Sequence, residues 1–136
     1  MRDELLGPKV EKIGVAIVQQ LSDNSEKIYN VYLLNLGDEI IDEILISSRG
    51  YGENITTGEK IKTSSLRHKI DLLMPNEVAQ FEPIMEDVFG LANEFWVSYY
   101  CHDKMYDKKF VFLPGALLEK NMKIIPVIES RGVMII

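Results

Sequence analysis

Apolar residues in this chain recur mostly at every second position, in short runs that end at Gly, Asn, Asp and Pro. Such alternation places successive side chains on opposite faces of a strand, and long patterns at the helical period of ~3.6 are missing. About seven such runs, with turns every ~8–12 residues, are typical of two packed antiparallel sheets. The sequence predicts a single all-β domain over residues 1–136, an antiparallel β-sandwich that is immunoglobulin-like. The alternative is an α+β domain with one sheet and two short helices, at 83–93 and 114–121.

The expected strands cover residues 12–21, 28–36, 40–48, 66–72, 78–84, 94–101 and 105–113, with a last strand within 124–136. The first has apolar residues at odd and even positions, which predicts cover on both of its faces. Leu36–Glu39 supplies the Gly and Asp of a tight hairpin between the second and third strands. Residues 49–60 contain three glycines and are predicted to form a loop. A second hairpin, rich in aromatic side chains, is expected to turn at 102–104.

Charge and cysteine content exclude several classes of function. The 15 Lys and Arg residues face 21 Asp and Glu residues, and the net charge of −6 opposes general binding to nucleic acids or to anionic membranes. The single cysteine cannot form an internal disulfide, which favours a reducing compartment. The first residues lack the ~7–15 apolar positions of a signal peptide, and no run reaches the ~18 apolar residues of a membrane span. We expect a soluble cytoplasmic protein without a membrane partner.

A local excess of positive charge is the clearest candidate for a binding site. Residues 60–69 contain Lys60, Lys62, Arg67 and Lys69 and no acid, so they carry +4 while the rest of the chain carries −10. Basic side chains beside an aromatic ring hold anions or acidic protein surfaces. The candidate residues are Arg49, Tyr51, Arg67 and His68. The alternative interpretation is that this strip is the solvated outer side of an edge strand.

Catalytic and metal sites find little support. Cys101 would need a base to become a nucleophilic thiolate, and the adjacent His102 points to the opposite side of a strand, which leaves only His68. A buried structural thiol is therefore favoured. Zinc sites take three or four ligands, mostly Cys and His, and this chain has one Cys and two His. We predict no cofactor, no metal and no catalytic residue.

The C-terminal segment 124–136 is unusually apolar, with Glu129 and Arg131 as its only charged residues. Leaving such side chains in water costs ~1.5–3 kcal/mol each relative to burial, so they must be covered. Either the domain covers them itself, or a second copy does in a symmetric dimer formed through the last strand or the aromatic hairpin.

Several stretches together resemble a family of short bacterial proteins. These stretches are 31–36, 48–52, 62–68, 94–98 and 106–110, and the resemblance covers nearly the whole chain. Members of that family are labelled as a phenylalanyl-tRNA synthetase alpha subunit, and the resemblance brings no catalytic residues with it. A class II synthetase core has roughly twice this length and ATP-binding arginines in recognisable motifs. The resemblance thus implies only a stand-alone bacterial domain.

Three functions follow as hypotheses. The first is a non-enzymatic protein-interaction module that binds another protein or itself. The second is a small-anion or RNA-end binding module, connected to translation, that uses the candidate residues named above. The third, which the sequence supports least, is a cysteine-dependent enzyme built on Cys101 and His68.

Overall fold

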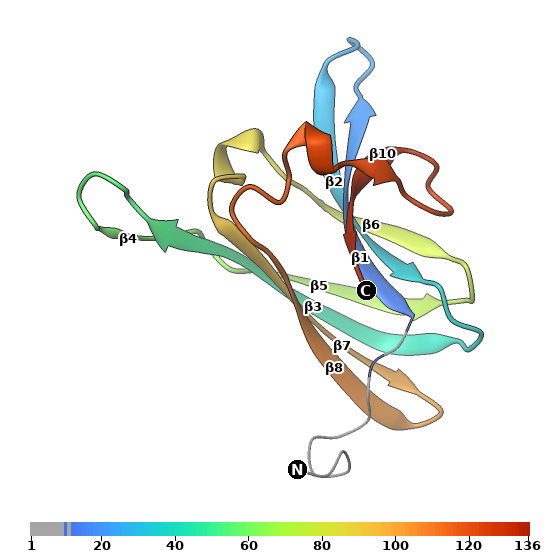
Figure 1. The fold of residues 1–136 in the computed structure, drawn as a ribbon. Coiled ribbons are helices and arrows are strands. Elements are labelled where there is room, and N and C mark those ends of the chain that lie inside the picture. Colours follow the sequence, from blue (N-terminus) through green and yellow to red (C-terminus); the bar gives the residue numbers. More distant parts are fainter. Residues whose placement is uncertain (1–9, 11) are drawn as a thin grey trace.

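The computed structural model describes residue 10 and residues 12–136, which form two antiparallel sheets packed face to face (Figure 1). The first sheet has the strand order β6-β2-β1-β10-β9, and the second has the order β4-β3-β7-β8 with β5 also paired to β3. The strands are β1 (Ile13–Leu21), β2 (Lys27–Asn35), β3 (Ile41–Glu53), β4 (Lys60–Lys62), β5 (Leu66–Leu73), β6 (Val78–Pro83), β7 (Ala92–Cys101), β8 (Lys104–Phe112), β9 (Lys123–Ile124) and β10 (Arg131–Ile135).

The all-β antiparallel sandwich is confirmed, while its immunoglobulin-like character stays a prediction. The α+β alternative is wrong because the expected helices reduce, within the described residues, to two 3-10 turns, η1 (Glu86–Val88) and η2 (Glu119–Asn121). Pro83 ends β6 at the edge of its sheet, where the missing N–H of proline disturbs no ladder.

The main core lies between the sheets, and β1 contributes to apolar clusters on both of its faces. Val15 and Ile17 point into the main core, whereas Ala16 and Val18 join a second cluster with Ile125 on the other face. All four β1 side chains are 0% exposed. The cover predicted for both faces of this strand is confirmed.

The hairpin expected at Leu36–Glu39 is wrong, because β2 and β3 lie in different sheets. The connection crosses from one sheet to the other, and the buried side chain of Asn35 holds it. The Asn35 amide donates to the backbone oxygens of Glu39 and Leu73, and its oxygen accepts from the Gly37 N–H. The two strands therefore bury their apolar faces against each other across the core instead of forming a ladder.

The loop expected at 49–60 is also wrong in part. Strand β3 continues to Glu53 and pairs with β4, and Figure 1 shows this hairpin projecting beyond the body of the sandwich. Gly50 and Gly52 serve close packing here, since a Cβ on Gly52 would lie 2.9 Å from the Leu91 Cδ2. The aromatic hairpin of β7 and β8 is confirmed, and its turn holds His102 and Asp103 at φ of 50° and 63°.

The chain itself covers much of its apolar C-terminal segment. Strand β10 pairs with β1 over Val15–Val18, and Val133 and Ile135 pack against the main core. Met134 packs against the second cluster, while Ile136 is 54% exposed at the end of the chain. The domain itself thus buries most of the apolar side chains of this segment, and the dimer stays a prediction.

Candidate functional site

The second sheet separates the four predicted binding residues onto its two faces. Paired residues of neighbouring strands share a face, and side chains alternate along each strand. Arg49, Tyr51 and Arg67 belong to the outer face, turned away from the first sheet, whereas His68 points inward and bonds to Glu82 of β6. The four residues therefore do not form one site.

Arg49 and Tyr51 are held by a buried carboxylate. Glu94 is only 4% exposed, and its Oε2 accepts from the Arg49 Nε at 2.9 Å while its Oε1 accepts from the Tyr51 hydroxyl at 3.4 Å. The Lys109 Nζ lies 3.8 Å from the same Oε1. A buried charge needs such partners, so the Arg49 guanidinium serves an internal ion pair first.

Arg67 lies in a row of residues that crosses four strands of the outer face. Arg67 pairs with Ser47, Ser47 with Trp96, and Trp96 with Lys109. The Lys109 Nζ stands 5.4 Å from the centre of the Trp96 ring, within the range of a cation–π contact. Trp96 is 46% exposed in the middle of the sheet, and the ion pairs of the described residues include none to Arg67.

A groove of about 390 Å³ runs along this row. We name it the Arg67–Trp96 groove. Ser47 lies between these two larger side chains, and Ser98 and its partner Leu45 continue the lining on the same face. The small serines leave the guanidinium and the indole standing above the sheet. A cation without an ion pair among the described residues, an exposed aromatic ring and an exposed aliphatic side chain thus meet at one place.

The basic strip at 60–69 divides between two elements. Lys60 and Lys62 lie on β4 in the projecting hairpin, where Lys60 pairs with Glu53 at 3.0 Å. Arg67 and Lys69 lie on β5, an edge strand of the second sheet. The strip is therefore no single patch, and of the cations it contains, Arg67 is the one that lines the groove.

A second polar group lies between the two sheets, where Ser48 and His68 of the second sheet meet Glu82 of β6 in the first. The Glu82 Oε1 accepts from the Ser48 hydroxyl at 2.7 Å and contacts the His68 Nε2 at 2.7 Å. Glu82 is 9% exposed, and the His68 side chain is 24% exposed. Since the carboxylate only accepts, Nε2 carries the proton of this hydrogen bond.

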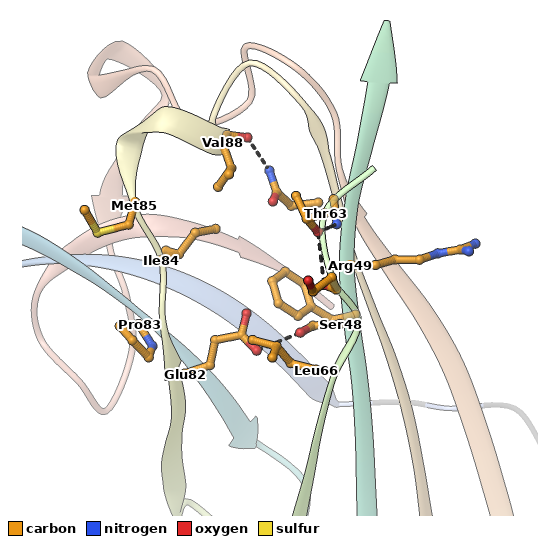
Figure 2. Close-up of a pocket in the computed structure, with 13 residues that line it drawn as sticks. Ser48, Arg49, Thr63, Leu66, Glu82, Pro83, Ile84, Met85 and Val88 are labelled. Atoms are coloured by element: carbon orange, nitrogen blue, oxygen red, sulfur yellow. Dashed lines mark hydrogen bonds between the residues drawn. The ribbon is translucent and has the colours of Figure 1, made fainter. Parts of the chain in front are cut away.

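Glu82 forms part of the wall of a pocket of about 260 Å³ at one end of the sandwich (Figure 2). Its apolar lining includes Leu66, Ile84, Met85, Val88 and Phe95. Figure 2 shows the Glu82 carboxylate with one oxygen bonded to Ser48 and the other directed towards the middle of the pocket. The same view shows the Arg49 side chain leaving the pocket on the far side of β3.

Sequence reasoning missed Glu82 because a β-bulge reverses the alternation. Phe81 packs against Phe95 in the core, so strict alternation would send the next side chain outward. The register of β2 and β6 shifts between Val31 and Tyr32, and Glu82 pairs with the fully buried Val31. Bulges of this kind re-aim single side chains, and no residue of 78–84 signals one.

Cys101 is not assembled into a catalytic pair. Within the described residues no hydrogen bond joins it to either histidine, because His68 contacts Glu82 and His102 contacts Glu39 at 2.8 Å. Burial, and after it the charges of Glu39 and Asp42, raise the pKa of the thiol above its ordinary value. A raised pKa lowers the thiolate fraction at neutral pH, the opposite of nucleophile activation.

Residue 10 and residues 12–136 contain no group of three or more His, Cys, Asp or Glu side chains that could hold a metal ion. None of the helical segments in the same residues has the length and apolar character to cross a membrane. Comparison of the chain with protein-family models, with curated protein sequences and with solved structures returned no match.

Proposed function

We propose that this chain is a non-enzymatic, cytoplasmic protein-interaction module that binds an acidic segment of another protein in the Arg67–Trp96 groove. The observation that carries the proposal is the exposed Trp96 close to the Arg67 guanidinium, which has no ion pair within the part of the chain that the structure describes. Trp, Tyr and Arg are the residues most enriched among the energetically dominant positions of protein interfaces. The partner is expected to place a carboxylate on Arg67 and an apolar side chain on Trp96.

A protein segment fits this surface better than a small anion does. A free anion in the groove would depend on one solvent-exposed guanidinium, and exposed ion pairs contribute only ~0–1 kcal/mol. The Arg49 guanidinium is already shared with Glu94, as described above. The apolar area of Leu45 and Trp96, 54% and 46% exposed, adds binding energy only for a ligand with apolar side chains. A small anion lacks this second contribution, and an RNA end, whose bases stack on an aromatic ring, has its phosphates opposed by the net charge of −6.

A second copy of the chain is disfavoured as the occupant of this face. In a two-fold dimer the same face meets itself, so Arg67 and Lys109 of one copy would approach those of the other. Like charges placed opposite each other oppose such a contact. Arg67 offers an acidic partner the complementary charge in the groove, while the Asp107 Oδ2 accepts from the Trp96 Nε1 at 3.3 Å beside it.

The chain contains one tryptophan, so the fluorescence of Trp96 reports directly on the groove. A synthetic ten-residue peptide with alternating Glu and Leu is titrated into the protein, beside an analogue in which Gln replaces every Glu. We expect a saturable change in Trp96 fluorescence with the acidic peptide and a much smaller one with the analogue. Arg67→Glu should weaken binding at least tenfold, since it replaces an attraction by a repulsion between like charges.

Lys123→Glu is the matched control, because it makes the same change of charge on β9 of the other sheet. It should leave the affinity for the acidic peptide unchanged. Equal responses to the two peptides, or equal affinities of the Arg67→Glu and Lys123→Glu proteins, would refute the proposal. Saturable binding of a short RNA oligonucleotide in place of the peptide would transfer support to the alternative function.

A further inference from the structure

The pocket beside Glu82 is lined by two largely buried polar side chains whose oxygen atoms can accept hydrogen bonds from a ligand. The Glu82 Oε1 is occupied by Ser48 and His68, and among the described residues the Oε2 has no hydrogen-bond partner. The Asn93 amide donates both to the Val88 and the Leu91 backbone oxygens, which leaves its Oδ1 without a donor there. These two oxygen atoms belong to side chains that are only 9% and 5% exposed, and neither atom is itself fully buried, so both are open to a ligand.

The donors around the pocket are largely engaged. The Ser48 hydroxyl donates to Glu82, the Thr63 hydroxyl donates to the Ser64 backbone oxygen, and the Gly50 N–H donates to Thr63. Arg49, the one basic residue in the lining, directs its guanidinium to Glu94 on the other face of the sheet (Figure 2). An anion would meet the Glu82 carboxylate with little to offset the repulsion.

From this arrangement we infer that the Glu82 pocket binds a primary ammonium group carried on a short apolar stem. An ammonium supplies three N–H donors and a positive charge, which match the carboxylate of Glu82, and the Asn93 side chain adds a further acceptor to the same lining. The stem lies against the side chains of Leu66, Ile84 and Val88. Charge-assisted hydrogen bonds of this kind are shorter and stronger than those between neutral groups.

The size of the pocket sets the size of the ligand. Its volume of about 260 Å³ equals the liquid volume of roughly nine water molecules at ~30 Å³ each. Drug-sized ligands occupy pockets of ~300–1,000 Å³, so the expected ligand is smaller than these. A butylammonium ion, or the side chain of a lysine presented by a peptide, falls within this limit.

The first experiment compares probes on the unmodified protein by amide chemical-shift titration. The probes are n-butylammonium, 1-butanol, which has the same stem without the charge, and tetramethylammonium, which has the charge without N–H donors. We expect saturable shifts at the pocket with n-butylammonium and at least tenfold weaker binding of the other two. N-acetyl-lysinamide distinguishes two sources of the ammonium group. If it binds more tightly than n-butylammonium, the ligand is a lysine side chain, and if it binds more weakly, the ligand is a free amine.

The second experiment changes a single atom of the pocket. Glu82→Gln keeps one carboxamide oxygen to accept from Ser48 and His68, and it replaces the pocket-facing oxygen with an NH₂ donor. We expect this variant to lose n-butylammonium binding by at least tenfold. Glu39→Gln is the matched control, because Glu39 also pairs with a histidine but is exposed and outside the pocket; its affinity should equal that of the unmodified protein.

Several results would overturn the inference. These are binding of 1-butanol or tetramethylammonium as tight as that of n-butylammonium, the absence of saturable binding of n-butylammonium, or an unchanged affinity in a folded Glu82→Gln protein. If Glu82→Gln does not fold, the comparison of the three probes on the unmodified protein still decides. The test is independent of the Arg67–Trp96 groove, which lies on the other face of the sheet.

Discussion

Gly132 lets β10 approach β1 more closely than any other residue would allow. A Cβ at this position would lie 2.4 Å from the backbone oxygen of Ile17 and 3.0 Å from the Cα of Val18. Both atoms belong to the backbone of the central strand β1, whose side chains there are 0% exposed, so β1 cannot yield. In Gly132→Ala, β10 must therefore retreat locally by about 1 Å to restore ordinary contact distances.

A retreat of that size stretches N–H···O bonds of ~2.9 Å beyond their useful range. Losing one or two of them costs ~0.5–1.5 kcal/mol each, and overpacking costs a further ~1–3 kcal/mol. The reduced entropy of the unfolded chain returns ~0.4–1 kcal/mol, so we expect a net destabilisation of about 2–4 kcal/mol.

The assay is equilibrium unfolding in urea, followed by circular dichroism. With a slope of ~1–3 kcal/mol per molar urea, the midpoint of Gly132→Ala should fall by about 1–2 M. Gly90→Ala is the matched control, because a Cβ there meets nothing within 4 Å. Ordinary surface substitutions change the free energy of unfolding by no more than ~0.5 kcal/mol. A change that small in Gly132→Ala would contradict the close approach of β10 to β1.

Two further predictions concern the thiol and the state of association. Because the pKa of Cys101 is raised, its thiolate fraction at pH 8 lies below that of a free thiol. Iodoacetamide should therefore alkylate Cys101 more slowly than it alkylates glutathione, and the rate should increase as the pH rises further. Equal rates at pH 8 would contradict this prediction. If the apolar C-terminal segment forms a dimer, light scattering should give about twice the chain mass of 15.6 kDa. A mass of one chain would remove the dimer and leave Val133 and Ile135 as ordinary core residues.

Alternation of apolar residues was sufficient to predict the class of fold and most strands. It worked because most strands bury one face, and burial of one face imposes period two on the sequence wherever the strand is regular. The cover on both faces of β1 followed from the same logic, as did the aromatic hairpin. Chemical type also identified Arg67 as a residue of interest before its surroundings were known.

What only the tertiary structure decided is which side chains meet. The turn at Leu36–Glu39 has the composition of a hairpin, yet it connects the two sheets. Asn35 stabilises this connection through hydrogen bonds to residues up to 38 positions away in the sequence. Register across three strands, rather than spacing along the chain, places Trp96 and Arg67 on either side of Ser47.

The bulge in β6 has no local signature, and it alone turns Glu82 into the core beside Ser48 and His68. Local sequence fixes the period of a strand, because backbone geometry sets it residue by residue. Partners depend on long-range pairing and on single irregularities, which arise from the packing of the whole domain.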